Sequence, residues 1–215
     1  MHVPLPFRES DPAYIKGFLQ SHGFATLVSS HQGRPMASHL LLETQGSDDS
    51  QLVLSGHMSR ENPQWRTFDP VNEVLAIFQG PHSYVSAARY SVPSAPTWNY
   101  ISVHVYGLPR LIEDRGELYA MLKRLVDAQE GSSPEEMRYT IESIPAGILE
   151  GMMNGVMGFQ IAVTRVEAAA KLSQNRSAPD RQRIIDELSA AGSPGSLDIA
   201  REMERRKGQL PPGKG

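Results

Sequence analysis

Two stretches of the chain alternate apolar and polar residues with the two-residue period of a half-buried β-strand. In residues 98–108, three apolar positions alternate with three polar ones: Ile101, Val103 and Val105 against Ser102, His104 and Tyr106. The same alternation recurs over residues 159–164. Strands with one apolar and one polar face suit an antiparallel barrel or open sheet, which is therefore the first expectation for this chain.

The remaining periodic segments place helices between early and late strands. We expect strands over residues 24–30, 35–42, 51–54 and 74–78, and helices over residues 12–22, 117–129 and, less regularly, 134–153. Residues 31–34 predict a hairpin connection, and residues 44–50 and 92–96 predict loops. The apolar run 74–78 is typical of a strand buried on both faces, and Gly80-Pro81 predicts a sharp turn after it. This order lacks the β-α-β alternation of a parallel sheet and predicts an α+β fold.

The composition changes after Arg176. Residues 179–190 and 197–207 predict charged helices, and residues 210–215 a frayed tail. We therefore expect a barrel domain over residues 1–176 and a helical extension with a tail over residues 177–215.

Several classes of function are disfavoured by the composition. The 215 residues include no cysteine, so disulfides and thiolate chemistry are excluded. The formal net charge of −3 gives no general attraction for nucleic acid. Apolar runs are too short to span a bilayer and the first residues do not resemble a signal peptide, so we expect a cytoplasmic protein. The seven histidines have no metal-site spacing, so no metal is predicted, and no nucleophile, dinucleotide or Walker motif occurs.

The densest polar cluster covers residues 56–65. Ser59, Arg60 and Asn62 offer a hydroxyl, a guanidinium and an amide where a strand is expected to give way to a short helix. Those groups suit a phosphate monoester. A helix cap with a surface arginine explains the same residues equally simply.

A second polar cluster covers residues 171–176 and combines two cations with three neutral hydrogen-bonding side chains. It could hold a phosphate or a polar ring edge, or be a solvated loop. Trp98 and Tyr100 could line a site for a planar ring, or could belong to the core.

Seven motifs then carry a resemblance along nearly the whole chain up to about residue 183. They are residues 26–35, Gly56-His57-Met58, Asn62-Pro63-Gln64-Trp65, residues 78–82, Pro96-Thr97-Trp98-Asn99-Tyr100, residues 103–107 and Lys171-Leu172-Ser173-Gln174-Asn175-Arg176. In order and spacing they resemble the PaiB family of FMN-binding split-barrel proteins. Two segments depart from the family pattern, residues 86–90 and the alanines at 168–170, and both departures remove bulk that would face the ring.

The resemblance implies a split β-barrel with flanking helices, a homodimer, and FMN at the subunit interface. It implies that Ser59, Arg60 and Asn62 contact the phosphate, that Ser38, His39 and Leu40 lie along the isoalloxazine, and that Lys171, Gln174 and Asn175 close over it. His57, Met58 and Trp98 complete the expected cofactor-binding set.

The family name is attached to negative regulation of degradative-enzyme and sporulation genes. The first hypothesis is therefore an FMN-binding transcriptional regulator that acts indirectly, because the chain has no recognisable DNA-binding motif. A flavin-dependent oxidoreductase of the pyridoxine-phosphate-oxidase type is the alternative, with His57 or His82 relaying protons and Lys171 or Arg176 holding an anionic substrate. A haem-handling protein on the same barrel is a third possibility.

Overall fold

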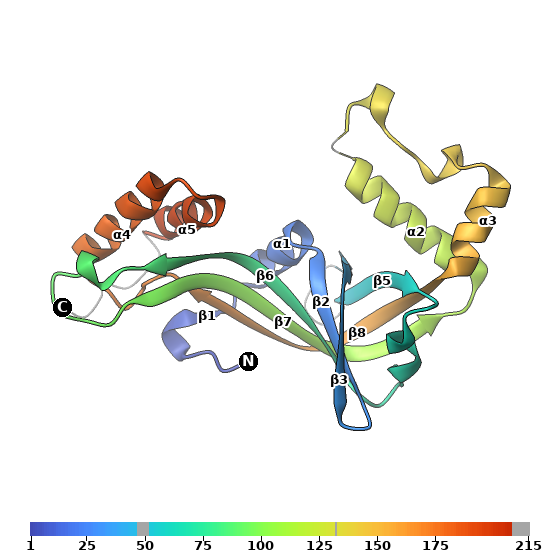
Figure 1. Ribbon diagram of the computed structural model, residues 1–215, viewed down its shortest axis with the longest axis horizontal. Coiled ribbons are helices and arrows are strands. Elements are labelled where there is room, and N and C mark those ends of the chain that lie inside the picture. The colour runs from blue at the N-terminus through green and yellow to red at the C-terminus, as the bar shows by residue number, and fades with distance from the viewer. Residues whose placement is uncertain (47–51, 132, 208–215) are drawn as a thin grey trace. The chain divides into compact units, whose positions relative to one another are not determined.

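A computed structural model describes residues 1–46, 52–131 and 133–207. The chain divides into two compact units (Figure 1). One unit comprises Lys16–Phe78 and Val105–Val166, and the other comprises Met1–Ile15, Gln79–His104 and the chain from Glu167 onward. The predicted boundary between residues 176 and 177 falls inside the latter unit and stays a prediction. Among the described residues, no helix is both long and apolar enough to cross a membrane.

The strands confirm the predicted α+β class with an antiparallel sheet. Hydrogen-bonded neighbours follow the order β3-β2-β6-β7-β8-β5-β4, and β1 pairs with β8. Their bounds are β1 Arg8–Glu9, β2 Phe24–His31, β3 Arg34–Leu41, β4 Glu43–Gln45, β5 Val53–Ser59, β6 Val74–Val85, β7 Thr97–Ile112 and β8 Val156–Lys171. The last three are long strands that contribute residues to both units.

The hairpin predicted at residues 31–34 is confirmed, and its turn consists of two residues, because His31 and Arg34 already pair with each other. Gln32 and Gly33 both have positive φ, 51° and 76°, which matches a turn whose twist suits antiparallel strands. This turn sets the register in which Leu27 faces Ser38 and Thr26 faces His39. A two-residue turn therefore decides where Ser38, His39 and Leu40 stand.

Two predictions around β5 are corrected. The expected strand 51–54 instead runs from Val53 to Ser59, so the first part of the polar cluster lies within the strand. The start of the expected loop 44–50 forms β4, because Thr44 pairs with Leu54 across the ladder and its side chain is buried. Residues 47–51 lie outside the described chain.

Two predictions about β6 are also wrong. The strand does not turn at Gly80-Pro81 but continues to Val85. Its first five residues bury only one face, since Val74, Ala76 and Phe78 are buried while Leu75 and Ile77 stay half-exposed. Among the residues that the structure describes, the apolar run is thus fully covered on one side only.

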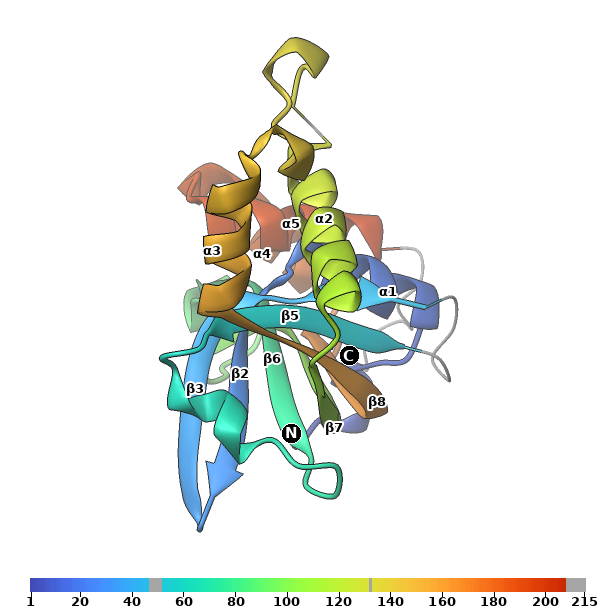
Figure 2. The same ribbon diagram turned by 90° about the vertical axis from the view of Figure 1, so that its right-hand side faces the viewer.

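The unit that contains β2–β5 also carries α2 (Arg115–Glu130) and α3 (Ala146–Gly155), which lie side by side in Figures 1 and 2. The predicted helical stretch 134–153 is broken into 3₁₀ turns η5 (Glu135–Met137) and η6 (Ile141–Ser143) before α3, which begins after Pro145. The two helices share a core of buried apolar side chains: Ile112, Leu118, Met121, Leu125 and Met153. Gly158 of β8 permits this packing, since a Cβ there would lie 2.7 Å from Leu118 Cδ1.

The other unit contains the start of α1 (Pro12–Ser21), up to Ile15, and all of α4 (Ala178–Ala191) and α5 (Pro194–Arg205). The two charged helices are therefore confirmed, and their apolar sides form a core: Ile184, Ile185, Leu188, Ile199 and Met203. Arg206, just after α5, pairs with Glu202 and with Glu9 of β1 at 2.6 Å each. This largely buried ion-pair network connects the end of α5 to the N-terminal segment. The tail expected over residues 210–215 lies outside the described residues.

Candidate functional site

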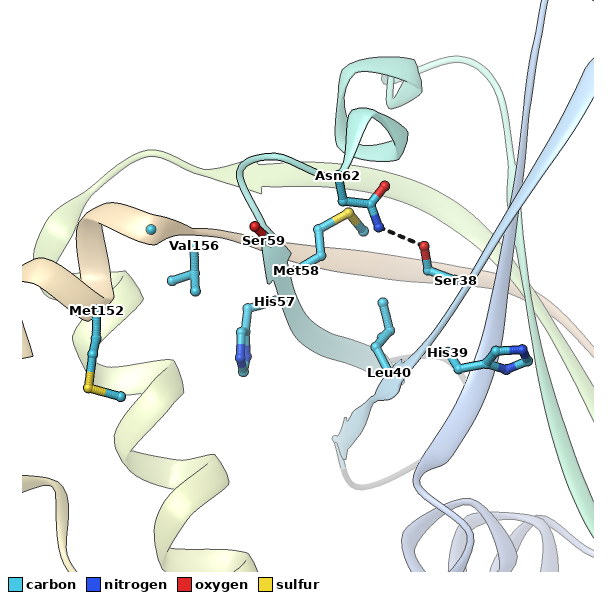
Figure 3. Close-up of a pocket in the computed structure, with 10 residues that line it drawn as sticks. Ser38, His39, Leu40, His57, Met58, Ser59, Asn62, Met152 and Val156 are labelled. Atoms are coloured by element: carbon cyan, nitrogen blue, oxygen red, sulfur yellow. Dashed lines mark hydrogen bonds between the residues drawn. The ribbon is translucent and has the colours of Figure 1, made fainter.

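A cavity of about 490 Å³ opens in the unit that contains β2–β5 (Figure 3). Its lining comes from β3, β5, the segment after β5, and the junction of α3 with β8: Ser38, His39, Leu40, His57, Met58, Ser59, Asn62, Met152, Gly155 and Val156. The cavity thus collects seven of the twelve residues predicted to bind a cofactor, and three that were not predicted.

Strand β3 supplies one wall. Leu40 is buried and Ser38 is half-buried, while His39 between them is exposed, as strand alternation requires. Figure 3 shows the His39 ring pointing away from His57. Its Nδ1 lies 3.0 Å from Thr26 Oγ1, so this imidazole already has a partner on the neighbouring strand.

Strand β5 supplies His57 and Met58. Burial lowers the pKa of His57 below its ordinary value, so the ring is neutral at pH 7. Its Nδ1 is buried and has no hydrogen-bond partner among the described residues. A buried, unpartnered nitrogen beside a cavity is a signal for a bound group, because such atoms are otherwise costly.

The segment after β5 is held by hydrogen bonds within the unit. Asn62 caps the 3₁₀ helix η3 (Pro63–Thr67), where its Oδ1 accepts from Gln64 N at 2.9 Å. Its Nδ2 donates to Ser38 Oγ at 2.7 Å, which links this segment to β3. The helix cap, the alternative explanation for this polar cluster, is therefore confirmed, and the Asn62 side chain that forms it also borders the cavity.

Arg60 does not line the cavity itself. Its guanidinium is exposed and makes no hydrogen bond or ion pair with the described residues. Its backbone is fixed, since its N–H donates to Gly155 O at 2.9 Å and its carbonyl accepts from Trp65 Nε1 at 3.1 Å. A cation is thus anchored next to Ser59 with its charged end in solvent.

Gln64 is a positioning residue that the sequence did not single out. Its side chain is 1% exposed and donates to two strand carbonyls, Leu27 O at 2.9 Å and Met36 O at 3.3 Å. It therefore holds η3, and with it Asn62, against the β2–β3 hairpin. A polar residue inside a short helix gives no sequence signal of such burial.

The third wall, Met152, Gly155 and Val156, was also missed. They lie at and just beyond the end of the helical stretch expected over residues 134–153, and nothing in their residue types indicates a site. Only the packing of α3 beside α2 brings them to the cavity.

The other four predicted residues belong to the other unit. Trp98 is 53% exposed and meets Tyr84 edge to face at 5.9 Å, so the alternative that it is a core residue is wrong. Lys171 donates to Thr97 Oγ1 on β7. Gln174 accepts from Leu172 N at 2.7 Å and donates to Ala170 O, so both ends of its amide hold the local turn, while Asn175 is exposed.

The lining fits the ring of a flavin better than its phosphate. The volume lies in the range of about 300–1,000 Å³ that is usual for ligand sites. Hydroxyls, two imidazoles and an amide stand among thioethers and aliphatic groups, which suits a planar ring with a polar edge. The lining contains no Lys, Arg, Asp or Glu, and Arg60 directly follows the lining residue Ser59 in the sequence.

Comparisons with known proteins agree with this fit. A family model described as "Putative FMN-binding domain" matches residues 1–165. "Protease synthase and sporulation protein PAI 2" of Bacillus subtilis is 36% identical over 204 residues, covering 95% of this chain and 97% of that protein.

Two solved structures show the same fold. The flavocytochrome Anf3 from Azotobacter vinelandii superposes with a TM-score of 0.59 at 16% identity, covering 79% of this chain and 72% of that one. The FAD and heme binding protein from Mycobacterium smegmatis gives a TM-score of 0.55 at 19% identity, covering 86% and 80%.

Proposed function

Because the chain belongs to the FMN-binding domain family, in which FMN is the cofactor, we propose that it holds the flavin ring in the cavity between β3, β5 and α3 and regulates gene expression indirectly. The name of the Bacillus subtilis relative connects that protein with protease synthesis and sporulation, which supports a regulatory role. The observation that carries the proposal is the convergence of Ser38, His57 and Asn62, from separate segments, on one cavity whose lining has no Lys, Arg, Asp or Glu.

Arg60 and Ser59 would hold the phosphate. The Arg60 guanidinium is free of partners among the described residues, and Ser59 Oγ accepts only from Glu61 N at 3.2 Å, which leaves its hydroxyl proton available. A charged hydrogen bond of this kind contributes about 1.5–3 kcal/mol. Removing the guanidinium should therefore weaken FMN binding by about 10- to 150-fold.

The test is a titration of the purified protein with FMN and with riboflavin, followed by quenching of flavin fluorescence. In Arg60→Ala we expect weaker binding of FMN and unchanged binding of riboflavin, which has the ring but no phosphate. Arg66→Ala is the matched control, since Arg66 is an exposed arginine on η3 close by in the sequence, stacks on Trp65 at 5.1 Å, and does not line the cavity. Equal losses for both ligands, or no loss at all, would refute the phosphate assignment.

Indirect regulation is tested with DNA. The net charge of −3 gives no overall attraction to a polyanion, so we expect a gel shift at moderate salt to show no preference for promoter DNA over scrambled DNA. Specific retention of promoter DNA would contradict the indirect mechanism while leaving the cofactor site untouched.

A homodimer in the cytoplasm is part of the same proposal. Its support is the half-exposed face of β6 and β2, where Leu75 stands opposite Val28 and Ile77 opposite Thr26, with Phe24 of β2 at 72% exposure. Apolar sheet faces of this kind are normally covered. Light scattering after size exclusion should give twice the mass of 23.7 kDa, and Ile77→Lys should give the monomer.

A flavin-dependent oxidoreductase remains the second candidate, and His57 is the observation that favours it. A neutral imidazole beside the cavity can accept or deliver a proton near a bound ring. Bound FMN would supply the redox chemistry. Oxidation of reduced nicotinamide by the FMN-loaded protein, lost in His57→Gln with FMN still bound, would support this candidate over a purely regulatory protein.

A further inference from the structure

We propose that Met152 is a site of reversible oxidation, and that its conversion to methionine sulfoxide releases the flavin from the cavity. This inference rests on the proposed function, because it concerns the same cavity. It adds a redox control that acts on the wall of the site and not on the cofactor.

Exposure singles out Met152 among the methionines around the site. It lines the cavity and is 55% exposed, whereas its neighbours Met58, Met153 and Met157 are buried. Figure 3 shows its thioether on the opposite side of the cavity from Leu40. Susceptibility of methionine to oxidation follows exposure, so this sulfur should react well before the buried ones.

The shape of α3 explains why the sulfur is uncovered. The helix packs through Leu149 and Met153, and most of its other residues are exposed. Gly151 and Gly155 flank Met152 on this open side, and a Cβ at either position would meet nothing within 4 Å. Since Met152 is 55% exposed and the two glycines add no side chain beside it, the residue is accessible to a small oxidant.

The oxidant is hydrogen peroxide. A sulfur lone pair of Met152 attacks one peroxide oxygen, the O–O bond breaks, and the second oxygen leaves as water after proton transfer. The thioether is oxidised by two electrons to the sulfoxide and the peroxide is reduced. Methionine sulfoxide reductases reverse the change with a thiol reductant.

The sulfoxide should oppose ring binding because it places a strong dipole on an apolar wall. A flavin ring seated there would strip water from the S=O oxygen, and Asn62, the side-chain amide that lines the cavity, already donates one of its two N–H groups to Ser38 Oγ. Leaving a buried acceptor unpaired corresponds to a loss of about 5- to 150-fold in affinity. By linkage, bound flavin should slow the oxidation of Met152.

The experiment oxidises the full chain with hydrogen peroxide and maps sulfoxides by peptide mass spectrometry. FMN affinity is measured before oxidation, after it, and after treatment with sulfoxide reductases. Met152→Leu keeps the apolar wall and removes the sulfur. The matched control is Met137→Leu, because Met137 is 74% exposed and does not line the cavity.

We expect both exposed methionines to oxidise first, and FMN to protect Met152 but not Met137. Oxidation should weaken FMN binding in the parent chain and in Met137→Leu, with recovery after reduction, and should leave Met152→Leu unaffected. Unchanged affinity with Met152 fully oxidised, or a loss that persists in Met152→Leu, would overturn this inference alone. Failure of the unoxidised chain to bind FMN would overturn the proposed function as well.

Discussion

Gln64 offers a direct test of how the candidate site is held together. Its amide donates to Leu27 O and Met36 O from a position that is 1% exposed, and its backbone N–H donates to Asn62. The substitution Gln64→Glu keeps the size and shape of the side chain. It replaces the NH2 group, which donates two hydrogen bonds, with a carboxyl group. When ionised, that group has only acceptor oxygens, and they would face the carbonyl oxygens of Leu27 and Met36.

The cost of this change can be worked out from its protonation. A carboxylate in that position is unpaired and repelled, so the folded variant should hold the introduced carboxyl group neutral. Keeping a glutamic acid of ordinary pKa protonated costs about 3.7 kcal/mol at pH 7 and about 1 kcal/mol at pH 5. The neutral acid has one O–H and restores one of the two hydrogen bonds, which leaves a further loss of about 1–2 kcal/mol at both pH values.

The assay is urea unfolding at pH 7 and pH 5, followed by circular dichroism. Gln64→Glu should lose about 5 kcal/mol at pH 7 and about 2–3 kcal/mol at pH 5, relative to the parent chain at the same pH. Gln64→Met, which lacks both donors and carries no charge, should lose about 2–4 kcal/mol at either pH. A loss for Gln64→Glu that is small or independent of pH would show that the side chain is not buried against these carbonyls. Gln20→Glu, on an exposed position of α1, should change little at either pH.

Two further predictions concern packing and pH. Gly107→Ala should destabilise the fold by about 1–3 kcal/mol or more, since its Cβ would lie 2.4 Å from the Ala162 carbonyl oxygen. Gly147→Ala, on the exposed side of α3, should instead stabilise the fold by about 0.5–1 kcal/mol. Equal effects of the two substitutions in urea unfolding would contradict the close approach of β7 and β8. Because the pKa of His57 is lowered in the folded chain, His57 of the unfolded chain is protonated at a higher pH, below about 6.5. The free energy of unfolding should therefore fall on acidification, and His57 should contribute at most about 1.4 kcal/mol per pH unit to this fall. The unfolding free energy of His57→Gln should therefore depend less steeply on pH between about 5 and 7, and an unchanged slope would mean that the ring is not buried.

Local pattern was enough for much of the fold and for part of the site. The alternation in β7 and β8, the spacing of apolar residues in α2, and Gln32-Gly33 between β2 and β3 each specify a local structure through side chains a few residues apart. The motif around His57 and Asn62 was recognisable for the same reason, since its residues are contiguous.

Only the tertiary structure decided which segments meet. The polar residues of β4 are typical of a loop, and only their pairing with β5 makes them a strand. The apolar run of β6 is typical of a strand buried on both faces, but in the structure only one of its faces is fully buried. Met152 and Gln64 reach the site through contacts between segments far apart in the sequence, and no local period records such contacts. The sequence alone determined the alternating strands β7 and β8, the helix α2, the turn between β2 and β3, and the chemistry of the polar cluster at residues 56–65. Packing between distant segments determined the walls of the cavity, because burial depends on what lies opposite a residue and not on its neighbours in the chain.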